Sequence, residues 1–451
     1  MSGPRFGWGM AVLCAAMTAR SAGARAVEAS DEPPPMDATV ERELATTARL
    51  ATILRVIGER NPDLREADER ARASELRTPA AARRPDPEVK GEAWGVPLAR
   101  PAAFDQANTL MLGLRQSFPA WGSLAARERA AHEEALAAGD VAETTRQDAA
   151  ARARRAFAAY VRADREYRLH VEHVGLASRV VDLARSLYQV GHGAQQDLLH
   201  AQAELSRLHV DVVGIEQQRR SAQASLNALM DRDPDAALGP APDAPAPEAG
   251  PRDAEPGDAA ERLGQRRPDL RAAARAVKRS EALVDVARRE ATLPALMVGA
   301  DYWYMPTFPS HHAYGAMVSM SLPWLNSGRP AEVTAAERTS VAERNALRSR
   351  LVTARFELKD AELKLRAARE TLALLQAGVL ADAKRNFEAA QAQFQSGRGD
   401  VTPVLDAARS YLEVRIEEIR ALAEVASSQA DYARAAGLPV VEMAAGHEGR
   451  R

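Results

Sequence analysis

Histidine and methionine side chains gather in one short stretch of this 451-residue chain. His311 and His312 are adjacent, and the nearby methionines are Met297, Met305, Met317 and Met320. Imidazole and thioether are soft ligands suited to copper or silver, so His311, His312 and Met305 are the candidates for a metal site. The alternative is that these are ordinary strand and loop residues. We prefer that alternative and assign no metal and no cofactor.

A second histidine pair, His170 and His173, lies in a charged stretch with helical spacing. We expect these imidazoles to lie on a solvated helix face rather than to bind a metal. The sequence contains no nucleotide-binding loop, no nucleophile elbow and no zinc-binding spacing such as His-Glu-x-x-His. The chain is therefore predicted not to be an enzyme. Its formal net charge of −2 gives no electrostatic reason to bind nucleic acid.

The elements that must position these residues occur twice. Residues 60–65 (Arg-Asn-Pro-Asp-Leu-Arg) recur at 266–271 (Arg-Arg-Pro-Asp-Leu-Arg), Ser74-Glu75 recurs as Ser280-Glu281, and residues 188–193 (Tyr-Gln-Val-Gly-His-Gly) recur at 394–399 (Phe-Gln-Ser-Gly-Arg-Gly). The offset, 266 minus 60, is 206 in all three cases. A constant offset indicates an internal duplication. We predict one structural repeat at 41–239 and a second at 258–438.

The remaining segments differ from the repeats in composition. Residues 1–26 are predicted to be a secretory signal peptide, because a basic residue precedes a short apolar core and small residues follow it. The only cysteine, Cys14, lies within this segment. A lipoprotein interpretation is open, although the bulky Leu13 stands where a small residue is expected. We predict a disordered lead at 27–40, a linker at 240–257 and a disordered tail at 439–451.

Long helices are predicted in both repeats. Aromatic residues make up only 5% of the chain, and the stretches 121–232 and 329–437 contain few helix breakers. Apolar residues follow a heptad spacing at Leu351, Leu358, Leu365, Leu372 and Val379, and alternating three- and four-residue steps from Leu198 to Leu229. A sustained spacing of 3.5 residues is typical of coiled coils. Each stretch is therefore predicted to be a long helical hairpin, and Pro62 is predicted to begin a helix capped by Asn61.

A strand pair is predicted before each hairpin, at 87–118 and at 293–322. Leu110, Leu112 and Leu114 alternate with other residues, and Tyr302 to Tyr304 stand near a strand end. Strands about 10 residues long with one apolar face match transmembrane barrel strands, and the aromatic residues suit an interfacial girdle. The alternative is a soluble antiparallel sheet. Four strands cannot close a barrel alone, so the barrel interpretation requires an oligomer.

The two turns carry a resemblance to a known family. Tyr188-x-x-Gly191 followed by Asp197-Leu198-Leu199-x-Ala201-Gln202, and the copy from Gly397 to Val404-Leu405-Asp406-Ala407, resemble the signature of TolC-like outer-membrane efflux proteins. The resemblance covers about residues 41–438. It implies a mostly α-helical fold with transmembrane β-strands. Four strands from each chain of a homotrimer would form a 12-stranded barrel, and the long helices would form a coiled-coil barrel.

The resemblance also implies a function and partners. The chain would be the passive exit duct of a tripartite efflux system, located in the outer membrane of a Gram-negative bacterium with a large periplasmic portion. Its partners would be outer-membrane lipid, a periplasmic adaptor (membrane fusion) protein and an inner-membrane pump of the resistance-nodulation-division type. The histidines and methionines favour heavy-metal efflux of the copper or silver type. The alternatives are a drug-efflux or type I secretion outlet and, from another class, a soluble periplasmic coiled-coil scaffold.

Two groups of site residues follow from the resemblance. The helical tips would contact the adaptor through Tyr188, Gly191, His192, Gly193, Asp197, Leu198, Leu199, Phe394, Gly397, Arg398, Gly399, Val404 and Leu405. In the family, carboxylates just past the second tip narrow the tunnel entrance. Asp406 falls on one such position, and Pro403 occupies another where some members have an acidic residue. We therefore expect a single ring of Asp406 carboxylates, against the alternative that Asp406 is a surface residue near a helix start.

Overall fold

The structure is a computed structural model that describes residues 36–96, 107–191, 193–242, 259–305, 311–396 and 400–440. Several predictions concern residues outside these ranges: the signal peptide with Cys14, most of the lead, most of the linker, nearly all of the tail, and the tip residues His192, Gly397, Arg398 and Gly399. Thr39–Arg451 form one compact unit. No helix in the described ranges is both long enough and apolar enough to cross a membrane.

Helices dominate the chain, with four strands among them, as the sequence predicts. The first half contains α2 (Ala38–Thr46), α3 (Leu50–Arg60), α4 (Pro62–Ala81), β1 (Glu88–Trp94), β2 (Thr109–Phe118), α5 (Ser123–Gln189) and α6 (Gln195–Leu229). The second contains α7 (Ala259–Arg266), α8 (Pro268–Thr292), β3 (Leu296–Tyr304), β4 (His312–Met320), η2 (Pro323–Leu325), α9 (Arg329–Leu374), η3 (Leu375–Val379), α10 (Leu380–Gln395) and α11 (Val401–Ala435). The offset of 206 residues relates the bounds of α6 to those of α11 and the bounds of α5 to the span from α9 to α10.

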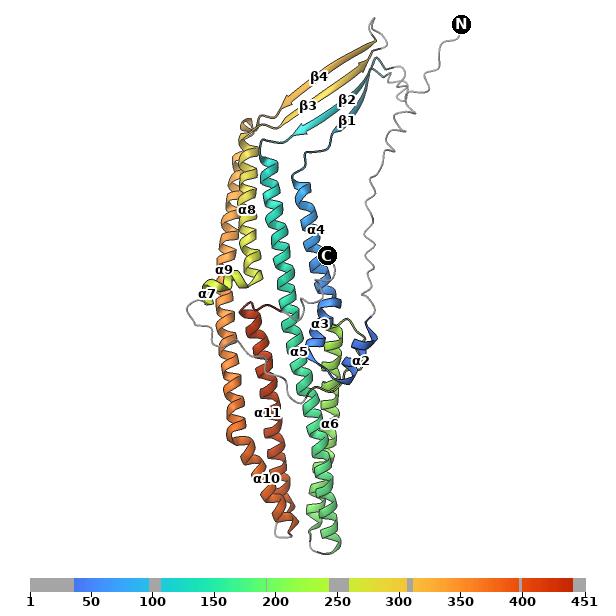
Figure 1. Cartoon of the computed structure of the whole chain (residues 1–451), viewed down its shortest axis with the longest axis vertical. Helices are drawn as coiled ribbons and strands as arrows, with labels where there is room; N and C mark the ends of the chain where they lie inside the picture. The colour runs from blue at the N-terminus through green and yellow to red at the C-terminus, as the bar shows by residue number, and fades with distance from the viewer. Residues whose placement is uncertain are drawn as a thin grey trace, which may run out of the picture. The chain divides into compact units, whose positions relative to one another are not determined.

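The helices form a wall in which long and short helices alternate. The 67-residue helix α5 packs against α4 and α6 and also against α8 and α11, and α9 packs against α8 and α11. Figure 1 shows α4 and α6 following one another along one side of α5, and α8 and α11 following one another along the other. Each pair of short helices thus takes the place of one long helix in the wall. Contacts must therefore hold the two short helices together where they meet.

The repeated Pro-Asp-Leu-Arg motif forms these joints. The Asn61 side chain accepts a hydrogen bond from the backbone N–H of Leu64, which confirms the predicted cap, and its Nδ2 donates to the Leu229 carbonyl at the end of α6 (2.9 Å). In the second copy Arg267 replaces Asn61 and donates to the Ala435 carbonyl at the end of α11. Both bonds span the same sequence separation, so the two joints are copies of one design.

Arg267 forms the more heavily bonded joint. Its side chain is almost fully buried and binds Asp269 and Glu357, each at 2.7 Å. Burial raises the pKa of Asp269, but the Arg267 guanidinium outweighs burial and holds that pKa below its usual value. The second joint therefore centres on a buried arginine, whereas at the first the Asn61 amide acts beside the Arg60–Asp231 ion pair (3.8 Å).

The four strands form one antiparallel sheet in the order β1-β2-β3-β4. The register aligns Gly91, Leu112, Tyr302 and Tyr314 in one row, so their side chains share a face. The adjacent rows on that face carry further apolar residues, among them Val89, Leu110, Leu114, Val298 and Val318, and all of these are exposed. In Figure 1 the sheet extends past the ends of the long helices.

The opposite face of the sheet is polar. Glu88 and Arg115 are direct partners in the register, and Lys90 lies in the same row as Asp301, across Gly113. A Cβ atom on Gly113 would lie 2.3 Å from Oδ1 of Asp301. The Asp301 carboxylate therefore occupies space that any side chain at position 113 would need. The sheet therefore has one apolar and one charged face, as the alternating pattern predicts.

The predicted heptads hold over most of their length. Along α6 every predicted core position from Leu198 to Leu229 is buried or half-buried. On α9, Leu365 is buried and Leu372 is half-buried, but Val379 is 46% exposed, so the prediction is wrong there. Val379 ends η3, a single π-helical turn. Such a turn adds one residue, and the seven-residue spacing resumes one position later at Leu380, Phe387 and Phe394.

The first joint makes a prediction about stability. Asn61→Ala removes both the cap and the bond to Leu229, and we expect a loss of about 1–2 kcal/mol. Asn61→Asp keeps a cap acceptor but cannot donate to Leu229, so it should fall between the parent and Asn61→Ala. Thermal unfolding of purified protein, followed by helical circular dichroism, gives the order. Equal stability of all three proteins would contradict the proposed joint.

Candidate functional site

The first helical tip is a tight reversal between α5 and α6. The backbone N–H of Gly191 donates to the Tyr188 carbonyl (3.1 Å), and Gly191 has a φ of +77°, a conformation that favours glycine. A Cβ on Gly193 would lie 3.1 Å from the backbone nitrogen of Tyr188. Tyr188 and Leu199 are exposed, and Asp197 and Leu198 are half-buried. The exposed side chains of this tip therefore include one aromatic residue, Tyr188, and one aliphatic residue, Leu199.

The second tip lies between α10 and α11, and Gly397 to Gly399 fall outside the described residues. On its flanks Phe394 is 5% exposed and Val404 is 1% exposed, while Leu405 is half-buried. Phe394 and Val404 therefore offer little surface in the single chain, and their contact with an adaptor stays a prediction. Their side chains are buried within the chain itself, where they hold the tip in place.

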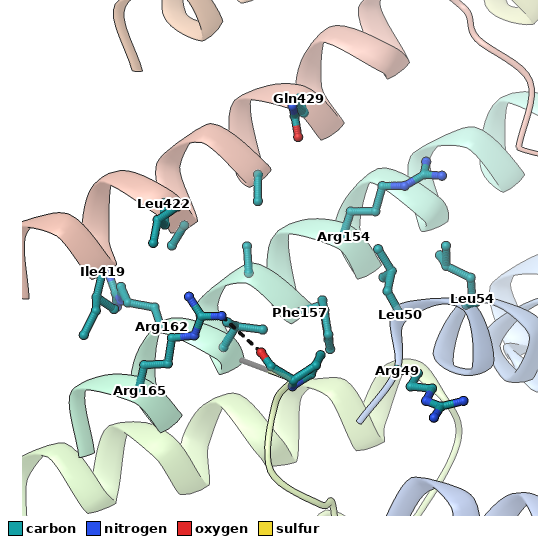
Figure 2. A pocket seen from close by; sticks show the side chains of 16 residues that line it. Arg49, Leu50, Leu54, Arg154, Phe157, Arg162, Arg165, Ile419, Leu422 and Gln429 are labelled. Atoms are coloured by element: carbon teal, nitrogen blue, oxygen red, sulfur yellow. Dashed lines mark hydrogen bonds between the residues drawn. The ribbon is translucent and has the colours of Figure 1, made fainter. Parts of the chain in front are cut away.

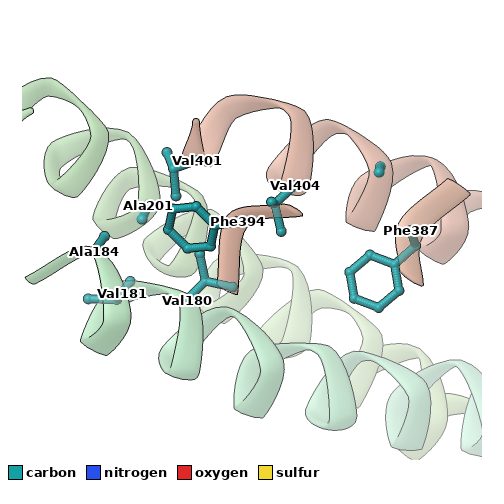
Figure 3. Close-up of a cluster of buried hydrophobic side chains, with 9 residues drawn as sticks. Val180, Val181, Ala184, Ala201, Phe387, Phe394, Val401 and Val404 are labelled. Carbon is teal, nitrogen blue, oxygen red and sulfur yellow. The ribbon is translucent and has the colours of Figure 1, made fainter. Parts of the chain in front are cut away.

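An apolar cluster binds the two tips together. Figure 3 shows Val180, Val181 and Ala184 of α5 facing Phe394 of α10 and Val401 and Val404 of α11, with Ala201 of α6 beside them. Leu198 and Leu405 pack against the edge of this tip cluster. Four helices thus share one core, which couples the position of the first tip to that of the second.

Asp406 lies in the second turn of α11 and is exposed. One turn further, Arg409 pairs with Glu204 of α6 at 2.6 Å, and this hydrogen bond raises the pKa of Arg409. This ion pair is not predictable from the sequence, because nothing in the spacing indicates that α6 and α11 meet there. Asp406 has no ion-pair partner among the described residues. Its negative charge lies about one turn from the Arg409–Glu204 pair.

His170 and His173 are buried, at 6% and 5% exposure, so the expectation of a solvated face is wrong. Their Nδ1 atoms lie 2.8 Å and 3.1 Å from the carbonyl oxygens of Glu166 and Leu169, one turn earlier on α5. Nε2 of His173 is buried with no hydrogen-bond partner in the described structure. The ring packs near Tyr411 of α11, with centroids 6.3 Å apart. The His173 ring therefore lies in the interface between α5 and α11.

Burial lowers the pKa of His173. Arg415 and His170 act in the same direction, whereas the bond to Leu169 and the carboxylate of Glu172 oppose it. The folded protein therefore favours the neutral ring more than the unfolded chain does.

The sheet separates His312 from two of the nearby methionines. His312 begins β4 opposite Tyr304, on the apolar face, whereas Met297 and Met317 belong to rows on the charged face. His312 Nδ1 bonds the Tyr302 hydroxyl, and His311 Nδ1 lies 3.4 Å from the backbone carbonyl of Met305, not from its sulfur. Among the described residues no group of three or more His, Cys, Asp or Glu side chains could hold a metal ion. The candidate residues His311, His312 and Met305 stay neighbours, but His311 contacts the backbone of Met305 and not its sulfur.

Comparison with known proteins identifies the family. The family model described as "Outer membrane efflux protein" matches residues 54–232 and 259–438. The chain belongs to this family. Its two matched segments correspond to the two halves of the duplicated wall. No curated protein matches the chain in sequence.

Solved structures share this fold. The outer-membrane channel OprN is 20% identical, with a TM-score of 0.73 over 86% of this chain and 89% of that one. CusC is 17% identical, with a TM-score of 0.75 over 90% and 97%. The CmeC outer membrane channel of Campylobacter jejuni is 17% identical, with a TM-score of 0.72 over 86% and 85%. At these identities the likeness establishes the fold.

The lowered pKa of His173 predicts a pH dependence of stability. As pH falls through the unfolded pKa of about 6.5, the unfolded chain binds a proton that the folded chain resists, so stability is lost on acidification. His173→Gln cannot titrate and should lose less stability than the parent between pH 7.5 and pH 5.5. Melting temperatures across this range test it, with the exposed His200→Gln as the matched control. A parent-like slope for His173→Gln, or a slope changed equally by His200→Gln, would refute the assignment.

Proposed function

We propose that this chain is one subunit of an outer-membrane exit duct in a tripartite efflux system, and that it conducts substrates passively. Membership of the outer membrane efflux protein family supports this proposal. The observation that carries it is the sheet, which exposes a continuous apolar face and carries charge on the other. Exposed apolar surface of this extent costs free energy in water and is stabilised in hydrocarbon.

The sheet edges support assembly into a closed barrel. β1 and β4 each pair with one neighbour in the described chain, which leaves an open edge on both sides. Open edges do not occur in the hydrocarbon region, because unpaired backbone groups there cost several kcal/mol each. Three subunits would pair β4 of one chain with β1 of the next and close a barrel of 12 strands. The apolar face would meet lipid, and the charged face would line the lumen.

The helical wall supports the same assembly. α9 packs on α8 and α11 but carries exposed apolar residues along its other side, among them Val352, Phe356 and Leu363. The opposite end of the wall is formed by α4 and α6, where Val210 and Val213 are exposed. Contact between these two ends in successive subunits would continue the alternation of long and stacked helices into a periplasmic tunnel.

The tips support docking to a periplasmic adaptor protein that connects the duct to an inner-membrane pump. The first tip offers Tyr188 and Leu199 as exposed contact residues, and we assign the larger part of the adaptor surface to it. We also propose that this pump is of the resistance-nodulation-division type, as the resemblance implies. The sheet places His312 and the methionines of the charged face on opposite sides, so we propose no metal cargo.

A pair of adjacent substitutions in β4 tests the membrane assignment. Val318 lies on the apolar face and is 74% exposed, and Ser319 lies on the charged face. Val318→Arg should cost up to about 2–4 kcal/mol for each copy, less the nearer this end of β4 lies to the membrane interface, and should reduce the outer-membrane trimer, whereas Ser319→Arg should assemble. Fractionation of cell envelopes and native electrophoresis measure both. Soluble parent protein in periplasmic extracts, or equal assembly of the two variants, would contradict the proposal.

Asp406 tests the tunnel entrance. If the exposed carboxylates of three subunits ring the pore, they favour cations there. Asp406→Asn should shift the channel toward equal permeability of potassium and chloride, because Arg409 and Glu204 remain paired. The reversal potential in a potassium chloride gradient across a planar bilayer measures this shift, and Asp211→Asn on the exposed side of α6 is the control. An unchanged reversal potential for Asp406→Asn would place this carboxylate outside the pore.

A further inference from the structure

Aromatic side chains stand at both ends of the apolar face of the sheet. At the end far from the helices, Tyr302, Tyr304 and Tyr314 share this face. At the helix end, Trp121 and Trp324 lie in the two turns that join the sheet to α5 and α9, and they are 86% and 58% exposed. The rows between the two ends carry mostly aliphatic side chains. Tyrosine and tryptophan are enriched at the two membrane–water interfaces, so this pattern marks both edges of a bilayer.

The length of the strands fits this placement. β3 has nine residues, which at about 3.3 Å per residue is about 30 Å of strand. Strands of membrane barrels tilt by about 35–45°, so β3 would rise about 21–25 Å, close to the height of about 25 Å of an outward-facing apolar band. The headgroups of the leaflet on the helix side would therefore lie level with the turns and with the start of α5 and α9.

Two arginines lie at this level. The guanidinium carbon of Arg84 lies 5.2 Å from the ring centroid of Phe118, which belongs to the last row of the apolar face. Arg289 of α8 donates to the Trp121 carbonyl (3.3 Å), and its Nη1 occupies space that a Cβ on Gly122 would need. No other hydrogen bond or ion pair engages either guanidinium among the described residues. A stacked guanidinium keeps its N–H groups free, and one bond leaves four of the five donors of Arg289.

No carboxylate of the described chain neutralises these two arginines. Glu290, which follows Arg289 in the sequence, pairs with Arg127 instead. Asp86 is exposed and forms no ion pair with either arginine within the described ranges. The backbone N–H groups of Leu124 and Ala125 at the start of α5 also lack a partner in the described structure, because the N-cap glycine has no side chain to offer one. This end of the sheet is therefore rich in donors and positive charge.

The arginines of the apolar cavity between α3, α5 and α11 differ in this respect. Figure 2 shows the hydrogen bond that Arg165 donates to the Pro242 carbonyl (3.1 Å). Arg162, on the same cavity, lies 4.0 Å from the Glu166 carboxylate. Those guanidinium groups are engaged within the chain, whereas the charges at the helix end of the sheet await a partner from outside it.

We propose that a collar formed by Arg84, Phe118, Trp121 and Arg289 binds the phosphate headgroups of anionic phospholipids in the leaflet on the helix side. This rests on the proposed duct, because the apolar face of the sheet must lie in a bilayer. The guanidinium groups donate to phosphate oxygens, Trp121 lies at the level of the glycerol backbone, and acyl chains pack on the apolar face. A zwitterionic headgroup with a choline carries a cation that the arginines repel, so the collar prefers a net negative lipid.

Native mass spectrometry tests the headgroup preference. Purified protein in detergent is mixed with equal amounts of phosphatidylglycerol and phosphatidylcholine that have the same acyl chains. We expect the parent to retain phosphatidylglycerol on the order of tenfold more than phosphatidylcholine. The double variant Arg84→Gln, Arg289→Gln should bring this ratio close to that of an unselective surface. Arg288→Gln is the matched control, because Arg288 is the exposed neighbour on α8 and pairs with Glu337 (2.7 Å).

Three results of this experiment would overturn the collar. They are equal retention of the two lipids by the parent, an equal loss of preference in Arg288→Gln, and displacement of phosphatidylglycerol by inorganic phosphate. The last result would show a site for a free anion rather than for a lipid.

The depth of Trp121 separates a failure of the collar from a failure of the duct. The protein is reconstituted in bilayers with bromine on the acyl chains, either near the glycerol or near the terminal methyl. The fluorescence difference between the parent and Trp121→Phe isolates this ring, and bromine near the glycerol should cause the larger loss of its emission. Equal or absent quenching in protein that floats with the bilayers would overturn the collar alone. A parent that does not float with bilayers would refute the duct and the collar together.

Discussion

The wall depends on matching the length of one long helix with two short ones. A helix of 67 residues is about 100 Å long, and neither the 20-residue α4 nor the 35-residue α6 spans that distance alone. End-to-end stacking solves this, but it brings the carbonyls at the end of one helix against the start of another. These groups need partners. Asn61 and Arg267 supply donors at the two junctions, and a left-handed residue, Asp231 or Gly437, then turns the chain away.

The two long helices differ in how many helices pack against them. α5 has stacked helices on both sides and buries residues along most of its length, whereas α9 has them on one side and buries only scattered residues such as Ala354 and Leu365. The two helices occupy equivalent places in the duplication, so in the proposed trimer the neighbouring subunit would cover the exposed side of α9. Under the proposed function the exposed apolar face of the sheet would likewise be covered, in its case by lipid.

Much of the fold followed from the sequence because periodicity is a local property. The duplication, the strand pairs, the Asn61 cap and the core positions of α6 were all readable from spacing. The site was less readable because exposure depends on tertiary neighbours. His170 and His173 lie in a charged stretch, yet both are buried, and His173 packs against Tyr411 of α11. Phe394 and Val404 belong to the tip motif, yet they lie in a core shared with the other hairpin. The pairing of Arg409 with Glu204 likewise required knowing that α6 and α11 meet.

The π-helical turn explains why two tips of similar sequence differ. Ser123–Gln189 and Arg329–Gln395 have the same number of residues, but only the second contains such a turn. One extra residue in a turn rotates everything beyond it by about 100° relative to an uninterrupted helix. Tyr188 and Phe394 occupy equivalent positions, and the first is 44% exposed while the second is 5% exposed. The rotation moves the aromatic ring of the second copy from the outer surface into the tip cluster. The flanks of the second tip thereby anchor the two hairpins together, whereas Tyr188 of the first copy faces outward.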